Sequence, residues 1–220
     1  NNRIYGLTKG QYSPTSLPGT KTKTSPYGSI EQSFNPLCVA IGAEATFVAR
    51  TVDRNTKHLA ATLRRAAAHK GTSFVEVYQN CNIFNDGAYL HLTDADVKDD
   101  HTLLLEHGKP MIFGKDSDKG IRLKGLDPEM VTLGNGVTED ELLVHDETAD
   151  QASLAYMLSR MEHPRQPVPL GVFRCIFKPT YEEQLLAQES AQVEERGDGD
   201  LATLYHSADT WEVGAEGEDT

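Results

Sequence analysis

The chain has 220 residues, 38% of them hydrophobic, with 33 acidic residues against 21 Lys and Arg and a formal charge of −12. This length suits one sizeable core with a peripheral extension, and the acidic balance, without aromatics interleaved among basic residues, argues against nucleic acid as a partner. The longest apolar runs, Leu37 to Ala45 and Pro169 to Phe173, fall far short of the roughly 20 residues of a bilayer span, so no membrane segment is expected.

The chain is expected to begin with a long loop. Gln11 to Ser29 is rich in Ser, Thr, Pro, Gly and Lys, and this composition cannot bury a core face. The pattern changes at Asn35, where NPLCVAIGA predicts a short helix with Pro36 in its first turn. The run ATFVAR, Ala45 to Arg50, then predicts a buried strand.

An amphipathic helix is predicted from Asn55 to His69. Its apolar face is expected to include Leu59, Leu63 and the pair Ala66/Ala67, and Gly71 is expected to stop it.

A second strand is predicted at TSFVEVYQ, Thr72 to Gln79. Strand, helix and strand with short links indicate a parallel βαβ unit, whose ligands gather beyond the carboxyl ends of the strands. Asn80, Cys81 and Asn82 lie at that end.

The later elements are less regular. Thr93 to Val144 is not placed in detail beyond two short strand candidates. The expected elements are strands at Pro110 to Gly114, Ile121 to Leu123 and Leu170 to Phe177, helices at Asp150 to Met161 and Tyr181 to Arg196, and a fraying acidic end, Gly214 to Thr220.

The three cysteines, Cys38, Cys81 and Cys175, are odd in number and unevenly placed, so no disulfide framework is expected. Their scarcity suits a reducing compartment, and a cytoplasmic location is expected. Cys38 and Cys175 lie among apolar residues and are interpreted as core. The chain starts with Asn1 and shows no leader, which indicates that an upstream part is missing.

The opening string NNRIYGLTKG, with SPTS at Ser13 to Ser16, resembles the segment that follows the diphosphate-binding motif in beta subunits of 2-oxoacid:ferredoxin oxidoreductases. GAEATFVAR, AAAHKGTSFVEVYQNC, VHDE, LAYMLSR, PLGVFR and DTWEV are similar to the family as well, so the resemblance extends from Asn1 to Val213. The long tail resembles the bacterial 2-oxoglutarate type.

This resemblance implies an α/β thiamine-diphosphate-binding fold, with a mostly parallel sheet flanked by helices and a C-terminal extension. Residues 1–92 would be the C-terminal part of the thiamine-diphosphate-binding domain. Residues 93–220 would be a family-specific region packed on it, ending in an acidic tail.

The resemblance also implies a magnesium site at the start of the chain. Mg²⁺ that clamps a diphosphate takes hard oxygen ligands in octahedral array. Asn2 would give its amide oxygen and Ile4 its backbone carbonyl, while the Asp of a Gly-Asp-Gly turn would lie upstream. Tyr5, Gly6 and Leu7 would complete the cofactor contacts. Taken without the resemblance, an Asn pair beside Gly and Tyr is an ordinary turn.

Two further residues carry expected contacts. In the family, the positions of Leu7 and Lys9 face the substrate pocket, and the Lys9 ammonium would bind the distal carboxylate of 2-oxoglutarate. Cys81 would be one ligand of a 4Fe-4S cluster whose other three cysteines lie upstream. Alone, Lys9 is an exposed loop lysine and Cys81 a small buried hydrophobe.

The implied reaction is oxidative decarboxylation of 2-oxoglutarate with coenzyme A to succinyl-CoA, with ferredoxin as electron acceptor. An alpha subunit would complete the thiamine site, so no catalytic base is expected in this chain and the fragment alone would be inactive. Two alternatives stay open, namely pyruvate or another 2-oxoacid as substrate, and a non-catalytic interaction subunit.

One motif is a decoy. RGDGD at Arg196 to Asp200 contains Gly-Asp-Gly but follows a helix and has no Asn pair downstream, so it is interpreted as a surface turn. The sequence contains no Gly-x-Gly-x-x-Gly fingerprint and no P-loop, which gives nicotinamide or triphosphate binding no support.

Overall fold

The computed structural model describes residues 1–134 and 136–211. The chain divides into one unit of Asn1–Lys178 and a second that begins at Pro179. The acidic end, 214–220, and the last two residues of DTWEV lie outside the described residues. The expected boundary between residues 1–92 and 93–220 stays a prediction.

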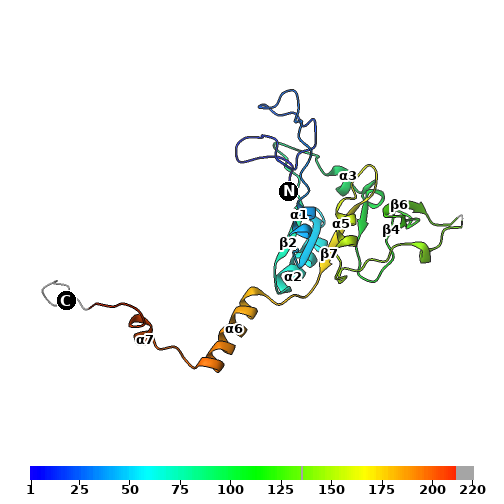
Figure 1. The fold of residues 1–220 in the computed structure, drawn as a ribbon. Coiled ribbons are helices and arrows are strands. Elements are labelled where there is room, and N and C mark those ends of the chain that lie inside the picture. Colours follow the sequence, from blue (N-terminus) through cyan, green and yellow to red (C-terminus); the bar gives the residue numbers. More distant parts are fainter. Residues whose placement is uncertain (135, 212–220) are drawn as a thin grey trace. The chain divides into compact units, whose positions relative to one another are not determined.

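A four-stranded sheet organises the first unit (Figure 1). Its order is β2 (Ser73–Tyr78), β1 (Phe47–Val52), β7 (Val168–Cys175) and β3 (Thr102–Leu104). The β1–β2 and β3–β7 pairs are parallel, whereas β1 and β7 run antiparallel. The expected α/β fold with a mostly parallel sheet is confirmed.

Helices cover both faces of this sheet. α2 (Thr56–Ala68) lies over the face that carries Phe47, Ala49 and Val172. The other face packs against α1 (Pro36–Gly42) and α5 (Ser153–Ser159) in the largest cluster of the core. Because both faces are covered, every residue of β1 is buried, as a near-continuous apolar run predicts.

The two predicted early helices form with the caps that the sequence supplies. Asn35 precedes α1 and its side chain accepts a hydrogen bond from the backbone N–H of Cys38, with Pro36 at the first position. Asn55 caps α2 in the same way through His58 N–H.

The predicted apolar face of α2 is wrong in two members, Leu63 and Ala67, which are both exposed. Leu63 is 46% exposed, whereas Thr62 is buried and Leu59 and Ala66 are half-buried. At about 100° per residue, positions 59, 62 and 66 share the stripe that faces the sheet, and position 63 falls at its border.

The middle of the first unit forms a separate antiparallel sheet of β4 (Ile112–Phe113), β5 (Lys119–Lys124) and β6 (Asp127–Thr132). This confirms the two strand candidates, and β3 and β6 were not expected from the sequence. The remaining short elements are α3 (Leu90–Thr93), α4 (Lys98–His101) and a 3-10 helix, η1 (Glu139–Glu141).

The second unit contains α6 (Tyr181–Arg196), which begins with a capping box between Thr180 and Glu183, and α7 (Leu201–Tyr205), which Asp200 caps. The Gly-Asp-Gly string is the turn between them, with Gly197 at φ +78°, as expected. Across the described ranges, no helix is long and apolar enough to cross a membrane.

The close approach of β7 to the chain after β3 generates the first prediction. Gly171 has φ +131°, and an added Cβ would lie 2.9 Å from the carbonyl oxygen of Leu105. Gly171→Ala should therefore lower the free energy of unfolding by about 2 kcal/mol, measured by thermal denaturation of the complete protein. Gly42→Ala is the control, because that Cβ meets no atom within 4 Å. Equal melting temperatures for the two variants would contradict this packing.

Candidate functional site

The first residues of the chain lie beside the carboxyl end of β2. The Asn1 backbone nitrogen donates to the Val77 carbonyl at 2.6 Å, and Gln79 N–H donates to the Asn1 carbonyl at 3.0 Å. The structure therefore places the Asn pair at the strand ends where parallel sheets bind ligands.

Asn2 and Ile4 flank a left-handed residue, Arg3, at φ +56°. The Asn2 side-chain oxygen accepts the Ile4 N–H at 3.3 Å, and Asn85 donates to the Asn2 carbonyl at 2.9 Å. Among the described residues, no donor reaches the Ile4 carbonyl oxygen. The Asn2 amide oxygen and this carbonyl are thus two oxygen donors on one tight turn.

These two oxygens fit part of a magnesium shell. Within residues 1–134 and 136–211, no group of three His, Cys, Asp or Glu side chains could hold a metal ion. Amide and carbonyl oxygens, by contrast, are suitable ligands for Mg²⁺, which usually takes only one or two carboxylates and fills the rest of its shell with phosphate and water.

A compact loop follows, from Tyr5 to Gln11. Tyr5 N–H donates to the Gln11 carbonyl at 2.8 Å, and Gly10 N–H donates to the Tyr5 carbonyl at 2.9 Å. Lys9 and Gly10 both have positive φ. The loop turns Lys9 outward, and Leu7 is 97% exposed, so neither side chain is used in the core of this unit.

The Cys81 turn lies at the end of β2. Asn85 N–H donates to the Cys81 carbonyl at 2.9 Å, which closes the turn. The backbone N–H of Phe84 and, to a smaller extent, those of Ile83 and Asn85 lower the pKa of the Cys81 thiol, against an opposing effect of desolvation. Backbone donors around sulfur stabilise a thiolate, which is the form that ligates metals.

The loop of residues 5–11 packs on this turn. A Cβ at Gly10 would lie 2.8 Å from Phe84 Cδ1, and one at Gly6 would lie 3.8 Å from the same ring. The structure therefore brings the candidate substrate loop against Phe84 in the turn that also contains Cys81, although no sequence pattern links the two segments.

A buried ion pair beside the site was not expected from the sequence. Arg50 Nε donates to Glu76 Oε2 at 2.9 Å, and their side chains are 2% and 3% exposed. The sequence did contain a signal for this pair. Each of two otherwise apolar strands has one charged residue, and parallel pairing places Arg50 beside Glu76. Such charges in buried strands indicate a pair.

Two stacked tyrosines extend this site. Tyr78 and Tyr89 have ring centroids 4.4 Å apart, and the Arg3 guanidinium lies 4.9 Å from the Tyr89 centroid. Burial raises the pKa of both phenols, so they stay neutral at physiological pH. The stack therefore presents a neutral aromatic face to the Arg3 cation.

The other two cysteines are not core residues. Cys38 and Cys175 are both half-buried, and the Cys38 sulfur lies 3.1 Å from Ser159 Oγ. Cys175 packs at the border of the cluster of Phe47, Ala49 and Val172, whereas Cys38 belongs to none of the apolar clusters that the described residues form.

The chain is similar to several known proteins. Residues 1–77 match the family described as thiamine pyrophosphate enzyme, C-terminal TPP binding domain. The chain is 41% identical, over 216 residues, to the 2-oxoglutarate oxidoreductase subunit KorB of Mycobacterium tuberculosis. The aligned region covers 97% of this chain and 57% of that protein. It is 31% identical to the 2-oxoacid:ferredoxin oxidoreductase 1 beta subunit of Aeropyrum pernix, over 84% of this chain and 48% of the relative.

A solved structure is similar as well. The 2-oxoglutarate:ferredoxin oxidoreductase from Magnetococcus marinus, with 2-oxoglutarate, coenzyme A and succinyl-CoA bound, matches with a TM-score of 0.61 and 25% identity. The match covers 95% of this chain and 56% of that one. The chain thus spans about half the length of the relatives it matches.

Proposed function

Because this chain belongs to the beta-subunit family of the 2-oxoacid:ferredoxin oxidoreductases, we propose that it is part of an enzyme acting on 2-oxoglutarate. The proposed reaction oxidatively decarboxylates 2-oxoglutarate with coenzyme A to succinyl-CoA and carbon dioxide, and two electrons pass to ferredoxin. The observation that carries this choice of substrate is the 41% identity, over nearly the whole chain, to a 2-oxoglutarate oxidoreductase subunit.

The start of the chain would hold the cofactor. Thiamine diphosphate supplies an electron sink for loss of carbon dioxide from a 2-oxoacid. The Asn2 amide oxygen and the Ile4 carbonyl would bind the Mg²⁺ of the diphosphate, since they lie on one turn and only the Asn2 oxygen receives an internal hydrogen bond, a long one of 3.3 Å. Tyr5, Gly6 and Leu7 would line the cofactor.

Lys9 would select a dicarboxylic substrate. Its side chain leaves the loop without an ion-pair partner among the described residues. A buried second carboxylate needs a cation beside it, and a lysine ammonium provides one as a point charge.

Cys81 would supply one thiolate to a 4Fe-4S cluster. The backbone N–H groups around its sulfur fit that role, and the packing of Phe84 on Gly10 would place the cluster near the cofactor loop. One cysteine meets one quarter of a four-thiolate shell, so the other ligands would come from the rest of the protein.

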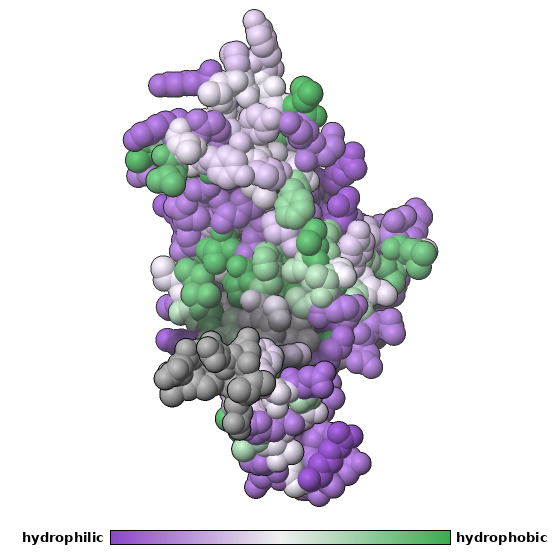
Figure 2. All heavy atoms as spheres, turned by 60° about the vertical axis from the view of Figure 1, so that its left-hand side comes forward, coloured by the Kyte–Doolittle hydropathy of each residue, from purple (hydrophilic) through white to green (hydrophobic). Residues whose placement is uncertain are grey.

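An alpha subunit would cover the exposed apolar residues of the first unit. Leu7, Tyr27 and Ile30 are each at least 90% exposed. Figure 2 shows a separate band of hydrophobic side chains across the middle of the face that it draws. Apolar surface of this kind marks interaction sites.

Three unpaired cysteines support the cytoplasm as the location.

The complete alpha-beta enzyme tests this function. It should contain stoichiometric thiamine diphosphate and reduce a viologen dye faster with 2-oxoglutarate than with pyruvate. A rate with pyruvate at least as high would move the proposal to another 2-oxoacid. Substoichiometric cofactor would favour a non-catalytic interaction subunit.

Lys9→Ala in the complete enzyme should raise the KM for 2-oxoglutarate about tenfold or more and leave pyruvate turnover unchanged, because only the dicarboxylate loses a charged contact. Lys23→Ala, in the same loop-rich segment, is the control. Equal losses for both substrates would identify Lys9 as a structural residue.

Cys81→Ser should remove the visible absorbance of the iron-sulfur cluster, since a serine oxygen replaces the thiolate. Cys38→Ser is the control and should retain the spectrum, because the Cys38 sulfur contacts Ser159 in this structure. An unchanged spectrum in Cys81→Ser would take Cys81 out of the cluster shell.

A further inference from the structure

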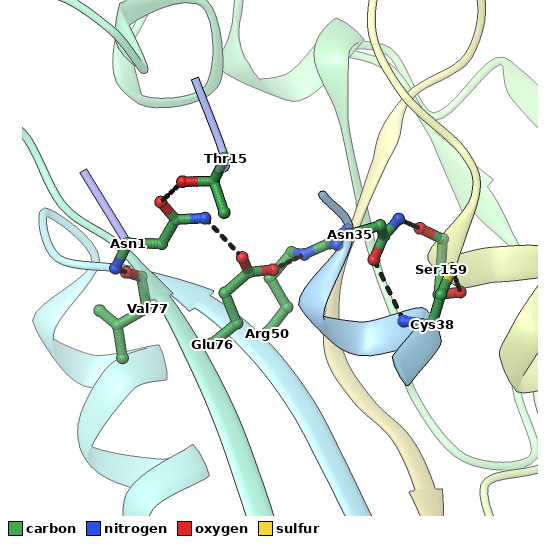
Figure 3. A network of polar contacts seen from close by, with 8 residues as sticks. All are labelled: Asn1, Thr15, Asn35, Cys38, Arg50, Glu76, Val77 and Ser159. Carbon is green, nitrogen blue, oxygen red and sulfur yellow. Dashed lines mark hydrogen bonds and ion pairs between the residues drawn. The ribbon is translucent and has the colours of Figure 1, made fainter. Parts of the chain in front are cut away.

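Asn1, the first member of the Asn pair, has a side-chain amide whose oxygen and nitrogen are both engaged (Figure 3). Its Oδ1 accepts hydrogen bonds from Thr15 Oγ1 at 2.8 Å and from Arg3 N–H at 3.1 Å. Its Nδ2 donates to Glu76 Oε1 at 2.7 Å. Because two donors point at the same side-chain atom of Asn1, that atom is the amide oxygen. The other atom is therefore the amide nitrogen, which donates a hydrogen bond to Glu76.

Glu76 joins this amide to the interior of the sheet. One carboxylate oxygen receives Asn1, and the other receives Arg50 Nε from the neighbouring strand. Arg50 is held in turn between the Tyr78 and Phe173 rings, at 5.1 and 5.5 Å from their centroids. The carboxylate therefore has little freedom to move away from Asn1.

The turn that Asn1 controls is the one with the two candidate magnesium oxygens. Asn1 Oδ1 receives the N–H of Arg3, the residue at φ +56° that separates Asn2 from Ile4. A non-glycine residue in this region is strained and persists only where its surroundings hold it. Ser16 Oγ, which donates to the Arg3 carbonyl at 2.5 Å, and the Tyr89 ring complete that hold.

We infer that Glu76, fixed by Arg50, is a positioning residue for the magnesium diphosphate turn and acts through the side chain of Asn1. This inference rests on the proposed function, in which Asn2 and Ile4 bind the metal. The pair lies within the sheet, so it preorganises the turn before the cofactor arrives. Arg50 pairs with the carboxylate and so stabilises Glu76 in its buried position, where it accepts from Asn1.

A reciprocal exchange tests the link. In Asn1→Asp, a carboxylate faces the Glu76 carboxylate and the hydrogen bond is lost. In Asn1→Asp combined with Glu76→Gln, the new amide at position 76 can donate to the new carboxylate at position 1 and still accept from Arg50, and the total charge is that of the original pair. The single exchange should raise the Kd of Mg²⁺·thiamine diphosphate about tenfold or more, and the double exchange should bring it back near the original value.

The measurement is a calorimetric titration of cofactor-free complete alpha-beta enzyme with thiamine diphosphate and Mg²⁺. Hydrogen exchange of the peptide over residues 1–16, without cofactor, gives an independent readout and should speed up in the single Asn1→Asp variant only. Asn55→Asp is the matched control, since it makes the same change at a helix cap where Asp serves equally well, and its Kd should not change.

The outcomes separate the two proposals. An original enzyme that binds no thiamine diphosphate overturns the proposed function. An original enzyme that binds it, with Asn1→Asp unchanged or with no recovery in the double exchange, overturns the positioning role alone. If Glu76→Gln prevents assembly, Asn1→Ala decides, because Asn1 is exposed, and an unchanged Kd in that variant overturns the inference.

Discussion

The buried ion pair between Arg50 and Glu76 constrains the structure around it. The two residues are register partners on parallel strands, so the pair forms only when β1 and β2 align as they do. A slip of one residue would place Arg50 opposite an apolar side chain and leave two buried charges unpaired. Breaking a buried pair costs about 3–5 kcal/mol. The pair is therefore a specificity device for the sheet.

The register of β1 and β2 also sets the positions of the residues at the carboxyl end of β2, where we propose that the cofactor and the substrate bind. Asn1 pairs with the end of β2 through backbone hydrogen bonds and meets Glu76 through its side chain, so the position of the sheet fixes the start of the chain. The Cys81 turn follows the same strand, and its Phe84 ring lies against Gly10 in the loop of residues 5–11. The proposed magnesium oxygens, the proposed substrate lysine and the proposed cluster cysteine thus all depend on the carboxyl end of one strand, β2.

The sequence predicted what depends on local patterns, and it missed what depends on tertiary pairing. Asn35 and Pro36 predict the start of α1 and Asn55 predicts the start of α2, because capping and proline geometry depend only on neighbouring residues. β6 was not expected, since Pro128 and exposed polar residues give no strand pattern and the pairing with β5 alone defines it. Asn2, Ile4, Lys9 and Cys81 came from resemblance to a family. The contact of Phe84 with Gly10 is long-range and left no sequence signal.

The most direct test of the account is a crystal structure of the complete enzyme with thiamine diphosphate and Mg²⁺ bound. We expect the Asn2 amide oxygen and the Ile4 carbonyl oxygen both to lie about 2.1 Å from the metal, with Asn1 still hydrogen-bonded to Glu76. A metal held by other residues, with the turn at Arg3 facing away from the diphosphate, would contradict it.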